Sequence, residues 1–202
     1  MEPNTGATSS FSEGTLQNHF LVAMPGMRDE RFSGSVIYLC AHGDDGAMGL
    51  IINRTQQLGF TDVLVELGIV ERSQSIRLPA PARNMAVRSG GPVDRSRGFV
   101  LHSGDYVVDS SMAVSEHICL TATVDILRDI SSGRGPRQAL MALGYSGWGA
   151  GQLEAEIAEN GWLACPATPE LLFENEVDSL YDRILGSMGI DPTHLSHLTG
   201  HA

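Results

Sequence analysis

Lysine is absent from this chain of 202 residues: all thirteen basic residues are arginines, and 24 acidic residues bring the net charge to −11. Schiff-base catalysis requires a lysine amine, and a Walker A loop requires a lysine that binds phosphate. Both kinds of chemistry are therefore excluded.

Long apolar runs are also missing. The longest of them, such as residues 36–41, are far shorter than the ~20 residues that a membrane-spanning helix needs. The first eighteen residues contain neither a basic segment nor an apolar one, so they do not resemble a secretory signal. We therefore expect no membrane association and a cytoplasmic location.

Cysteine is scarce and does not form a motif. Cys40, Cys119 and Cys165 are odd in number and widely separated, each lies in an apolar stretch, and no Cys-x-x-Cys occurs. This pattern favours buried, reduced thiols over a disulfide or a metal site.

The apolar residues that are present predict a core with strands early and helices late, which favours an α+β fold over regular βαβ alternation. Residues 35–53 predict a β-hairpin that turns at HGDDG. Helices are predicted over 61–67, 136–143 and 152–159. The predicted organisation is a flexible arm at 1–18, a single domain at 19–190 and a tail at 191–202.

Three histidines are the polar residues best placed for chemistry, because His19, His42 and His102 each stand at the end of a predicted strand. If they converged in one cleft, they could act as acid and base or bind a metal. The simpler interpretation, which we favour, is that each is a hydrogen-bonded structural residue. We predict no metal ion and no cofactor.

Two glycine-rich strings resemble catalytic motifs without meeting their requirements. GYSGW at 144–148 has Trp148 where a nucleophile elbow needs glycine, and we expect this tryptophan to be a core anchor. After HGDDG the pattern is that of a strand, whereas a phosphate loop leads into a helix. We predict no catalytic residue in either string.

Charge is unevenly distributed along the chain. Residues 72–97 contain six arginines and one aspartate, whereas residues 138–202 contain nine acidic residues and one arginine. Free arginines in the first segment would suit an acidic protein partner or a small anion, but we favour their pairing with the chain's own carboxylates. The net charge and the lack of a recognition helix argue against direct binding to nucleic acid.

Four strings taken together resemble one bacterial family. They are HFLVAMPGM at 19–27, SVIYLCAHGDDGAMGLIIN at 35–53, VRSGGPVDRSRGFVLH at 87–102 and ALGYSGWGAGQLEAEIAENGWL at 142–163. Their content and spacing are similar to the AlgH/YqgE family over residues 18–202. The family pattern usually has a carboxylate just before the motif histidine, and this chain has Ala41 there.

The resemblance implies an α+β fold with a bifurcated mixed β-sheet that contains a small closed barrel and is surrounded by helices. It also implies a cytosolic bacterial protein, and many relatives are described as transcriptional regulators. No activity is established for the family as a whole. The candidate ligand or pocket residues are His42, Asn53, Arg88, Gly90, Gly91, His102, Trp148, Gln152 and Glu154.

Three functions stay open at this point. The first is a non-enzymatic regulatory protein that acts through a protein partner at segment 72–97. The second is a protein that binds a small anion or nucleotide through the Gly90–Gly91 turn with Arg88 or Arg95. The third is a hydrolase built on His42 and His102. We favour the first, because the sequence shows no nucleophile paired with a base and no cluster of metal ligands.

Overall fold

The structure, a computed structural model, describes residues 14–195, so most of the predicted arm at 1–18 and of the tail at 191–202 lies outside the described residues. The strands are β1 His19–Ala23, β2 Val36–Gly43, β3 Gly46–Ile51, β4 Thr55–Gly59, β5 Ala86–Ser89, β6 Val93–Ser103, β7 Met112–Ala113, β8 Ile118–Thr121, β9 Ala139–Gly149 and β10 Trp162–Pro166. The α-helices are α1 Phe60–Glu66, α2 Ala80–Asn84, α3 Val124–Ser131, α4 Gln152–Ala158, α5 Pro169–Leu172, α6 Leu180–Ser187 and α7 Pro192–Leu195. Three 3-10 helices are η1 Glu30–Phe32, η2 Arg72–Arg77 and η3 Val177–Ser179.

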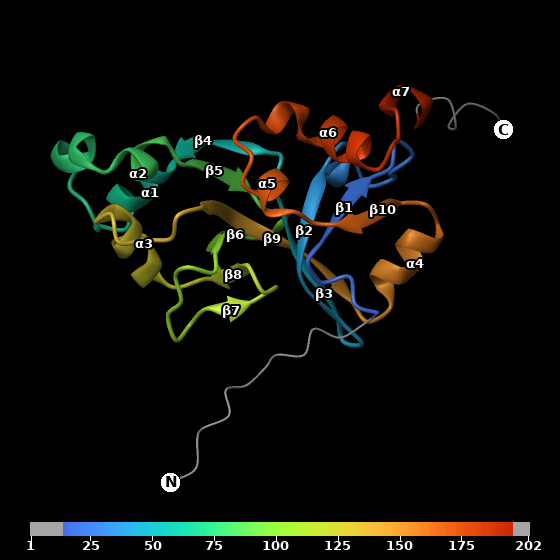
Figure 1. Cartoon of the computed structure of the whole chain (residues 1–202), viewed down its shortest axis with the longest axis horizontal. Helices are drawn as coiled ribbons and strands as arrows, with labels where there is room; N and C mark the ends of the chain where they lie inside the picture. Colours follow the sequence, from blue (N-terminus) through green and yellow to red (C-terminus); the bar gives the residue numbers. More distant parts are fainter. Residues whose placement is uncertain (1–13, 196–202) are drawn as a thin grey trace, which may run out of the picture.

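The long strand β9 organises the molecule. Its first half lies between β5, which runs parallel to it, and β6, which runs antiparallel. Its second half pairs with β3 instead, and β3 continues through β2 and β1 to β10. The mixed sheet therefore branches at β9, with α1, α2 and α3 gathered at one end of the molecule and α4 at the other (Figure 1).

The sheet is curled but does not close. The strand order is β10-β1-β2-β3-β9-β6-β8-β7, with β4 attached through β5. A barrel needs every strand to pair on both sides. Among the described residues β10, β7 and β4 each have a single partner strand, so the expected small closed barrel is not observed.

The helix predicted over 136–143 is wrong, because this segment begins β9. The string PRQALMAL is rich in helix-forming residues and has no β-branched side chain. In the fold, however, Leu140, Met141 and Ala142 are buried in the sheet between β5 and β6, and β9 continues through the glycine-rich string to Gly149. Burial on both faces of the sheet overrides the local preference.

Other local predictions are confirmed. Residues 35–53 form the β2–β3 hairpin, and α1 and α4 occupy the helices predicted at 61–67 and 152–159. The start of α1 differs in detail, because the predicted cap Thr61 lies inside the helix and Asp62 Oδ2 accepts from Gly59 N at 3.1 Å. This acidic residue therefore satisfies a backbone donor at the N-terminus of the helix.

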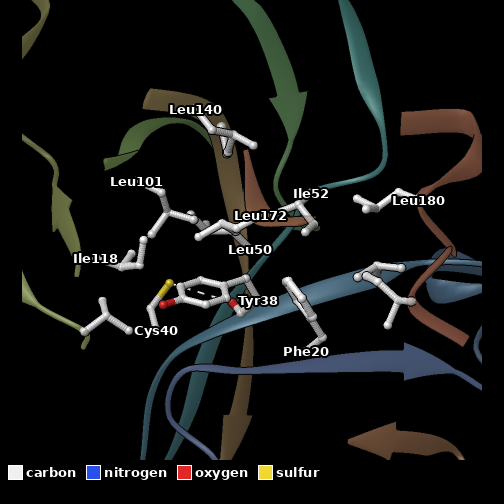
Figure 2. Close-up of a cluster of buried hydrophobic side chains, with 14 of the residues drawn as sticks. Phe20, Tyr38, Cys40, Leu50, Ile52, Leu101, Ile118, Leu140, Leu172 and Leu180 are labelled. Atoms are coloured by element: carbon white, nitrogen blue, oxygen red, sulfur yellow. Dashed lines mark hydrogen bonds between the residues drawn. The ribbon is translucent and has the colours of Figure 1, made fainter. Parts of the chain in front are cut away.

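The largest part of the core lies where the curled sheet meets α5 and α6 (Figure 2). Phe20 and Tyr38 from the neighbouring strands β1 and β2 pack edge to face, with ring centroids 6.1 Å apart. Leu140 from β9 and Leu172 from α5 complete this cluster. Burial of these side chains, at roughly 1.5–3 kcal/mol each, fixes the position of the α5–α6 segment over the sheet.

The cysteine prediction is confirmed, because Cys40, Cys119 and Cys165 are all free and buried. Burial raises the pKa of each thiol above its ordinary value. No helix in the described part of the chain is long and apolar enough to cross a bilayer.

Candidate functional site

His42 lies near the end of β2 and has both ring nitrogens occupied. Leu16 N donates to Nδ1 at 3.0 Å, and Nε2 lies 2.7 Å from Glu154 Oε1 on α4. A backbone N–H can only donate, so Nδ1 accepts and Nε2 carries the proton that it donates to Glu154. Residues 15 and 16, which were predicted to belong to a flexible arm, thus hydrogen-bond to β2.

Glu154 supplies His42 with a carboxylate from another element, while position 41 remains alanine. The pKa of the Glu154 carboxyl is lowered, chiefly by a hydrogen bond from its own backbone N–H and to a lesser extent by the hydrogen bond from His42. This arrangement holds the imidazole in one tautomer and leaves neither nitrogen for a substrate. The geometry favours the structural interpretation of His42.

His102 is fully buried in β6 and is also saturated. Its Nδ1 lies 3.1 Å from Ser103 O, and its Nε2 lies 2.8 Å from Thr121 Oγ1. Since a carbonyl oxygen can only accept, Nδ1 is protonated and Nε2 accepts from the threonine hydroxyl. Burial lowers the pKa of His102, which keeps the ring neutral.

His42 and His102 do not share a cleft. Through the ladders, His42 aligns with Ala47 and then with Trp148, whereas His102 aligns with Ala139 at the opposite end of β9. Nine residues of strand separate the two levels, which corresponds to about 30 Å. The hydrolase built on these two histidines is therefore contradicted.

His19 stands apart from both rings: it aligns with Pro166 of β10, and its Nδ1 contacts Gln17 O at 3.1 Å. The three candidate histidines therefore have separate partners. In the part of the chain that the structure describes, no group of three His, Cys, Asp or Glu residues is arranged to hold a metal ion.

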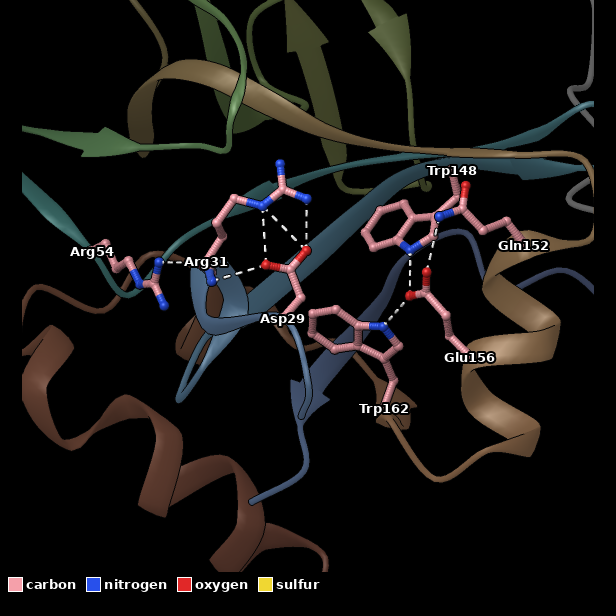
Figure 3. A network of polar contacts seen from close by, with 7 residues as sticks. All are labelled: Asp29, Arg31, Arg54, Trp148, Gln152, Glu156 and Trp162. Carbon is pink, nitrogen blue, oxygen red and sulfur yellow. Dashed lines mark hydrogen bonds and ion pairs between the residues drawn. The ribbon is translucent and has the colours of Figure 1, made fainter. Parts of the chain in front are cut away.

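Trp148 belongs to a cluster of hydrogen bonds centred on a carboxylate, which was not predicted from the sequence (Figure 3). Glu156 Oε2 accepts from Trp148 Nε1 at 2.9 Å and from Trp162 Nε1 at 2.8 Å, while Glu156 Oε1 accepts from Gln152 Nε2 at 2.9 Å. The two indoles are 7% and 3% exposed, so the prediction that Trp148 is buried is confirmed. Glu154 and Glu156 bind different partners, as their spacing of two residues predicts.

The remaining candidates from the family pattern hold backbone in place. Asn53 Oδ1 accepts from Val36 N at 2.8 Å, and its amide donates to Gly34 O at 2.9 Å. A Cβ atom on Gly90 would lie 2.3 Å from Gly144 O, and one on Gly91 would lie 2.2 Å from the carbonyl of Tyr145. These glycines let the chain pass close to β9.

Arg88 is the candidate whose interactions are incomplete. It lies on β5 and is 4% exposed, and its side chain makes one hydrogen bond to the described residues, from Nη2 to Glu174 O at 3.3 Å. Its Nε is buried and has no hydrogen-bond partner among residues 14–195, and burial lowers the pKa of the guanidinium. The Glu174 carboxylate binds Arg183 and the backbone N–H groups of Asn175 and Glu176 instead.

Arg88 lines a cavity of about 500 Å³ between α2, β5, the 133–138 loop and the segment after α5. None of the described residues that line this cavity is acidic, although the chain has a net charge of −11. We call it the Arg88 cavity. Its lining combines two arginines, three amides and apolar side chains; the residues that matter here are Arg88, Arg137, Asn84, Gln138, Asn175 and Phe173.

Taken together, these observations define an α+β protein with a branched sheet, histidines that are tied into the fold, and one ligand-sized cavity around a buried arginine. The sequence matches the family described as AlgH-like over residues 20–193, and the chain belongs to that family.

Relatives of known sequence and structure agree with this assignment. The chain is 82% identical over 188 residues to a UPF0301 protein of Chelativorans sp. (strain BNC1), covering 93% of each. It is 71% identical over 189 residues to a UPF0301 protein of Mesorhizobium japonicum, covering 94% of each.

Two solved structures share the fold. The solution structure of the AlgH protein from Pseudomonas aeruginosa superposes with a TM-score of 0.76 at 38% identity, covering 96% of this chain and 99% of that one. A crystal structure from Corynebacterium diphtheriae superposes with a TM-score of 0.69 at 21% identity, covering 97% of this chain and 94% of that one, which supports the fold alone.

Proposed function

We propose that this chain is a non-enzymatic regulatory protein that binds a small carboxylate-bearing molecule in the Arg88 cavity. The observation that carries the proposal is a buried guanidinium with no carboxylate partner among the described residues, lining a cavity that contains no acid. His42 and His102 take no part, because the fold uses all four of their ring nitrogens.

A buried charge is expensive unless something compensates it. An arginine does not escape this cost by losing its proton, because its pKa remains very high even when burial lowers it. A bound carboxylate would supply both the missing charge and acceptors for the guanidinium N–H groups. The proposal therefore explains a feature that is otherwise unfavourable in the free protein.

The lining indicates which anions fit. One buried positive charge matches one negative charge, and a planar guanidinium matches a carboxylate. Phe173, Met85, Leu140 and Ile130 provide apolar walls for the rest of the ligand. We therefore expect monocarboxylates with an apolar body to bind better than inorganic phosphate.

Thermal unfolding with added octanoate, benzoate or inorganic phosphate tests the proposal. A ligand at a hundred times its Kd stabilises the native state by about 2.7 kcal/mol. For a chain of this size that corresponds to a rise in Tm of about 5–10 °C. We expect this rise with the carboxylates and a smaller one with phosphate.

Variants of the arginine identify the site. Arg88→Met removes the charge at similar volume and is expected to abolish the rise, while Arg88→Lys keeps the charge without the planar fork and is expected to weaken it. Arg83→Gln on α2 is the matched control, because Arg83 is exposed and does not line the cavity. A rise that persists in a folded Arg88→Met protein would contradict the proposal.

A second candidate function is supported by the exposed arginines of segment 72–97. The preferred expectation that these residues pair within the chain is wrong for the described structure. None of them forms an ion pair with a described residue, and five are exposed: Arg72, Arg77, Arg83, Arg95 and Arg97. This surface is available to an acidic protein partner.

A pull-down at low and high salt tests the partner surface with the triple variant Arg77→Gln, Arg83→Gln, Arg95→Gln. Exposed arginines accelerate association with an acidic partner at low salt and do so less at high salt. The matched control is Arg31→Gln, Arg128→Gln, Arg134→Gln, which changes the net charge equally at arginines that already pair with aspartates. If both variants lose the same partner, the loss follows from net charge alone and segment 72–97 is not a specific binding surface.

A further inference from the structure

A second cavity adjoins the Arg88 cavity. It has a volume of about 410 Å³ and lies beside the loop after β6 and the turn before β8. The two cavities share three lining residues, Arg137, Gln138 and Phe173. The two cavities are therefore neighbours, and a ligand anchored at Arg88 has to pass these side chains to reach the second one.

The two cavities differ in the sign of their charge. The second cavity contains two carboxylates, Asp105 and Glu116, and the Arg88 cavity contains none. Asp105 is already compensated, because Arg137 Nε lies 3.8 Å from Asp105 Oδ2 and Arg137 N donates to the same oxygen at 3.1 Å. Glu116 is exposed and has no hydrogen bond or ion pair with any described residue.

We propose that the ligand of these joined cavities is an amphoteric molecule, with a carboxylate at one end and an ammonium group at the other. The carboxylate pairs with Arg88, the ammonium group pairs with Glu116, and the connecting part packs against Phe173. This inference rests on the proposed function, because Arg88 anchors the ligand in both.

The charges of the two cavities distinguish an amphoteric ligand from a dicarboxylate and from a simple fatty acid. A dicarboxylate would bring its second charge towards Glu116, where like charges repel. A simple fatty acid would gain apolar contacts in the second cavity but would bring no charge to pair with Glu116. A ligand with opposite charges at its two ends pairs with both the buried Arg88 and the exposed Glu116.

Matched probe pairs test the inference by titration calorimetry: hexanoate, octanoate and dodecanoate, each compared with its ω-amino counterpart and its dicarboxylate. An exposed ion pair contributes up to about 1 kcal/mol, so at the best chain length we expect the amino acid to bind about two- to five-fold more tightly than the plain acid. The dicarboxylate of that length is expected to bind least tightly.

The variant Glu116→Gln should bring the ratio between amino acid and plain acid close to one, with plain-acid binding unchanged. Glu159→Gln is the matched control, because it removes the same charge just after α4, which lies at the right of Figure 1 and apart from β6 and β8, and it should preserve the ratio. If plain acids bind and Arg88→Met abolishes their binding, but the amino group adds nothing at any length, this inference is wrong and the proposed function stands. If no probe binds the parent, both fail.

Discussion

The two ends of the sheet treat buried polar groups in opposite ways. Beside α4, a single carboxylate oxygen of Glu156 accepts from the indoles of Trp148 and Trp162. At β5, the Arg88 guanidinium has one buried nitrogen without a partner and no carboxylate within the described structure. The first region is complete without a ligand, and the second is not.

This difference between the two regions indicates which one stabilises the fold and which one binds a ligand. A buried polar group that has its hydrogen bonds contributes modestly to stability, whereas one that lacks them is destabilising by about 1–3 kcal/mol. Such a group is tolerated where a ligand supplies the missing partner in the working state. We therefore assign the α4 end to holding the fold together and the Arg88 end to recognition.

The largest effect on stability is expected for Trp148→Ala. The indole is 7% exposed, stacks near Phe32 with centroids 6.4 Å apart and donates to Glu156. Truncation of a buried aromatic residue lowers the free energy of unfolding by about 3–5 kcal/mol. Denaturant unfolding measures this loss, and an unchanged midpoint would contradict the assignment of this region to the core.

An intermediate effect is expected for Glu156→Leu. This substitution leaves two buried indole N–H groups without an acceptor, which lowers the free energy of unfolding by about 1–3 kcal/mol. Glu154→Leu is the control two residues away. Its carboxylate is half exposed and accepts from one imidazole N–H instead of two indole N–H groups, so we expect a smaller loss, of about 1 kcal/mol. Equal losses in the two variants would contradict the conclusion that the hydrogen bonds from the two indoles to Glu156 make a particular contribution to stability.

Arg88→Met is expected to change the stability of the ligand-free protein by no more than about 1 kcal/mol, and an increase is as consistent as a decrease. Replacement of an imperfectly paired buried charge by an apolar side chain of similar length is often neutral or stabilising. Denaturant unfolding without added carboxylate measures it. A loss as large as that of Glu156→Leu would mean that Arg88 is a structural residue, because its bond to Glu174 O would then be essential.

Local pattern predicted much of the fold. The hairpin at 35–53 followed from β-branched and apolar residues around a turn, and α4 followed from the amphipathic string after Gly151. The segment at 136–143 failed because its alanine, leucine and methionine residues favour helix, while the sheet places it between β5 and β6. The strand conformation of this segment depends on β5 and β6, which are distant in sequence, so no local pattern could predict it.

The candidate site was predicted only in part. Arg88 was named as a candidate, but for its position beside a glycine turn, whereas the structure relates it to a cavity whose lining does not include Gly90 or Gly91. Glu156 was missed because its partners Trp148 and Trp162 come from two different strands. The arginines of segment 72–97, which form no ion pair with a described residue, show the same limit, since composition counts charges and does not place them.

Acid is expected to produce a smaller change, by adding a positive charge to a buried side chain that is neutral and hydrogen-bonded in the fold. His102 is neutral in the fold, where Nε2 accepts from Thr121 Oγ1 and burial lowers the pKa of the ring. Protonation would turn Nε2 into a donor, so that Thr121 Oγ1 would have to change from donor to acceptor, and it would place a positive charge in a fully buried site. In the unfolded chain the imidazole has its ordinary pKa of about 6.5 and takes up a proton more readily.

The direction of the pH dependence follows from these two states. Between about pH 6.5 and the lower pKa of the folded protein, the unfolded chain binds a proton that the fold excludes, so the free energy of unfolding falls as the pH is lowered. The carboxyls of Asp129, Glu154 and Glu174 have lowered pKa values and lose their contributions only below about pH 4.5. The change in the free energy of unfolding between pH 7.5 and 5.5 therefore reports on histidine and not on these carboxyls. We expect His102→Gln to flatten that dependence and His42→Gln to retain it; a parent whose stability is constant over this range would show that burial does not exclude the proton from His102.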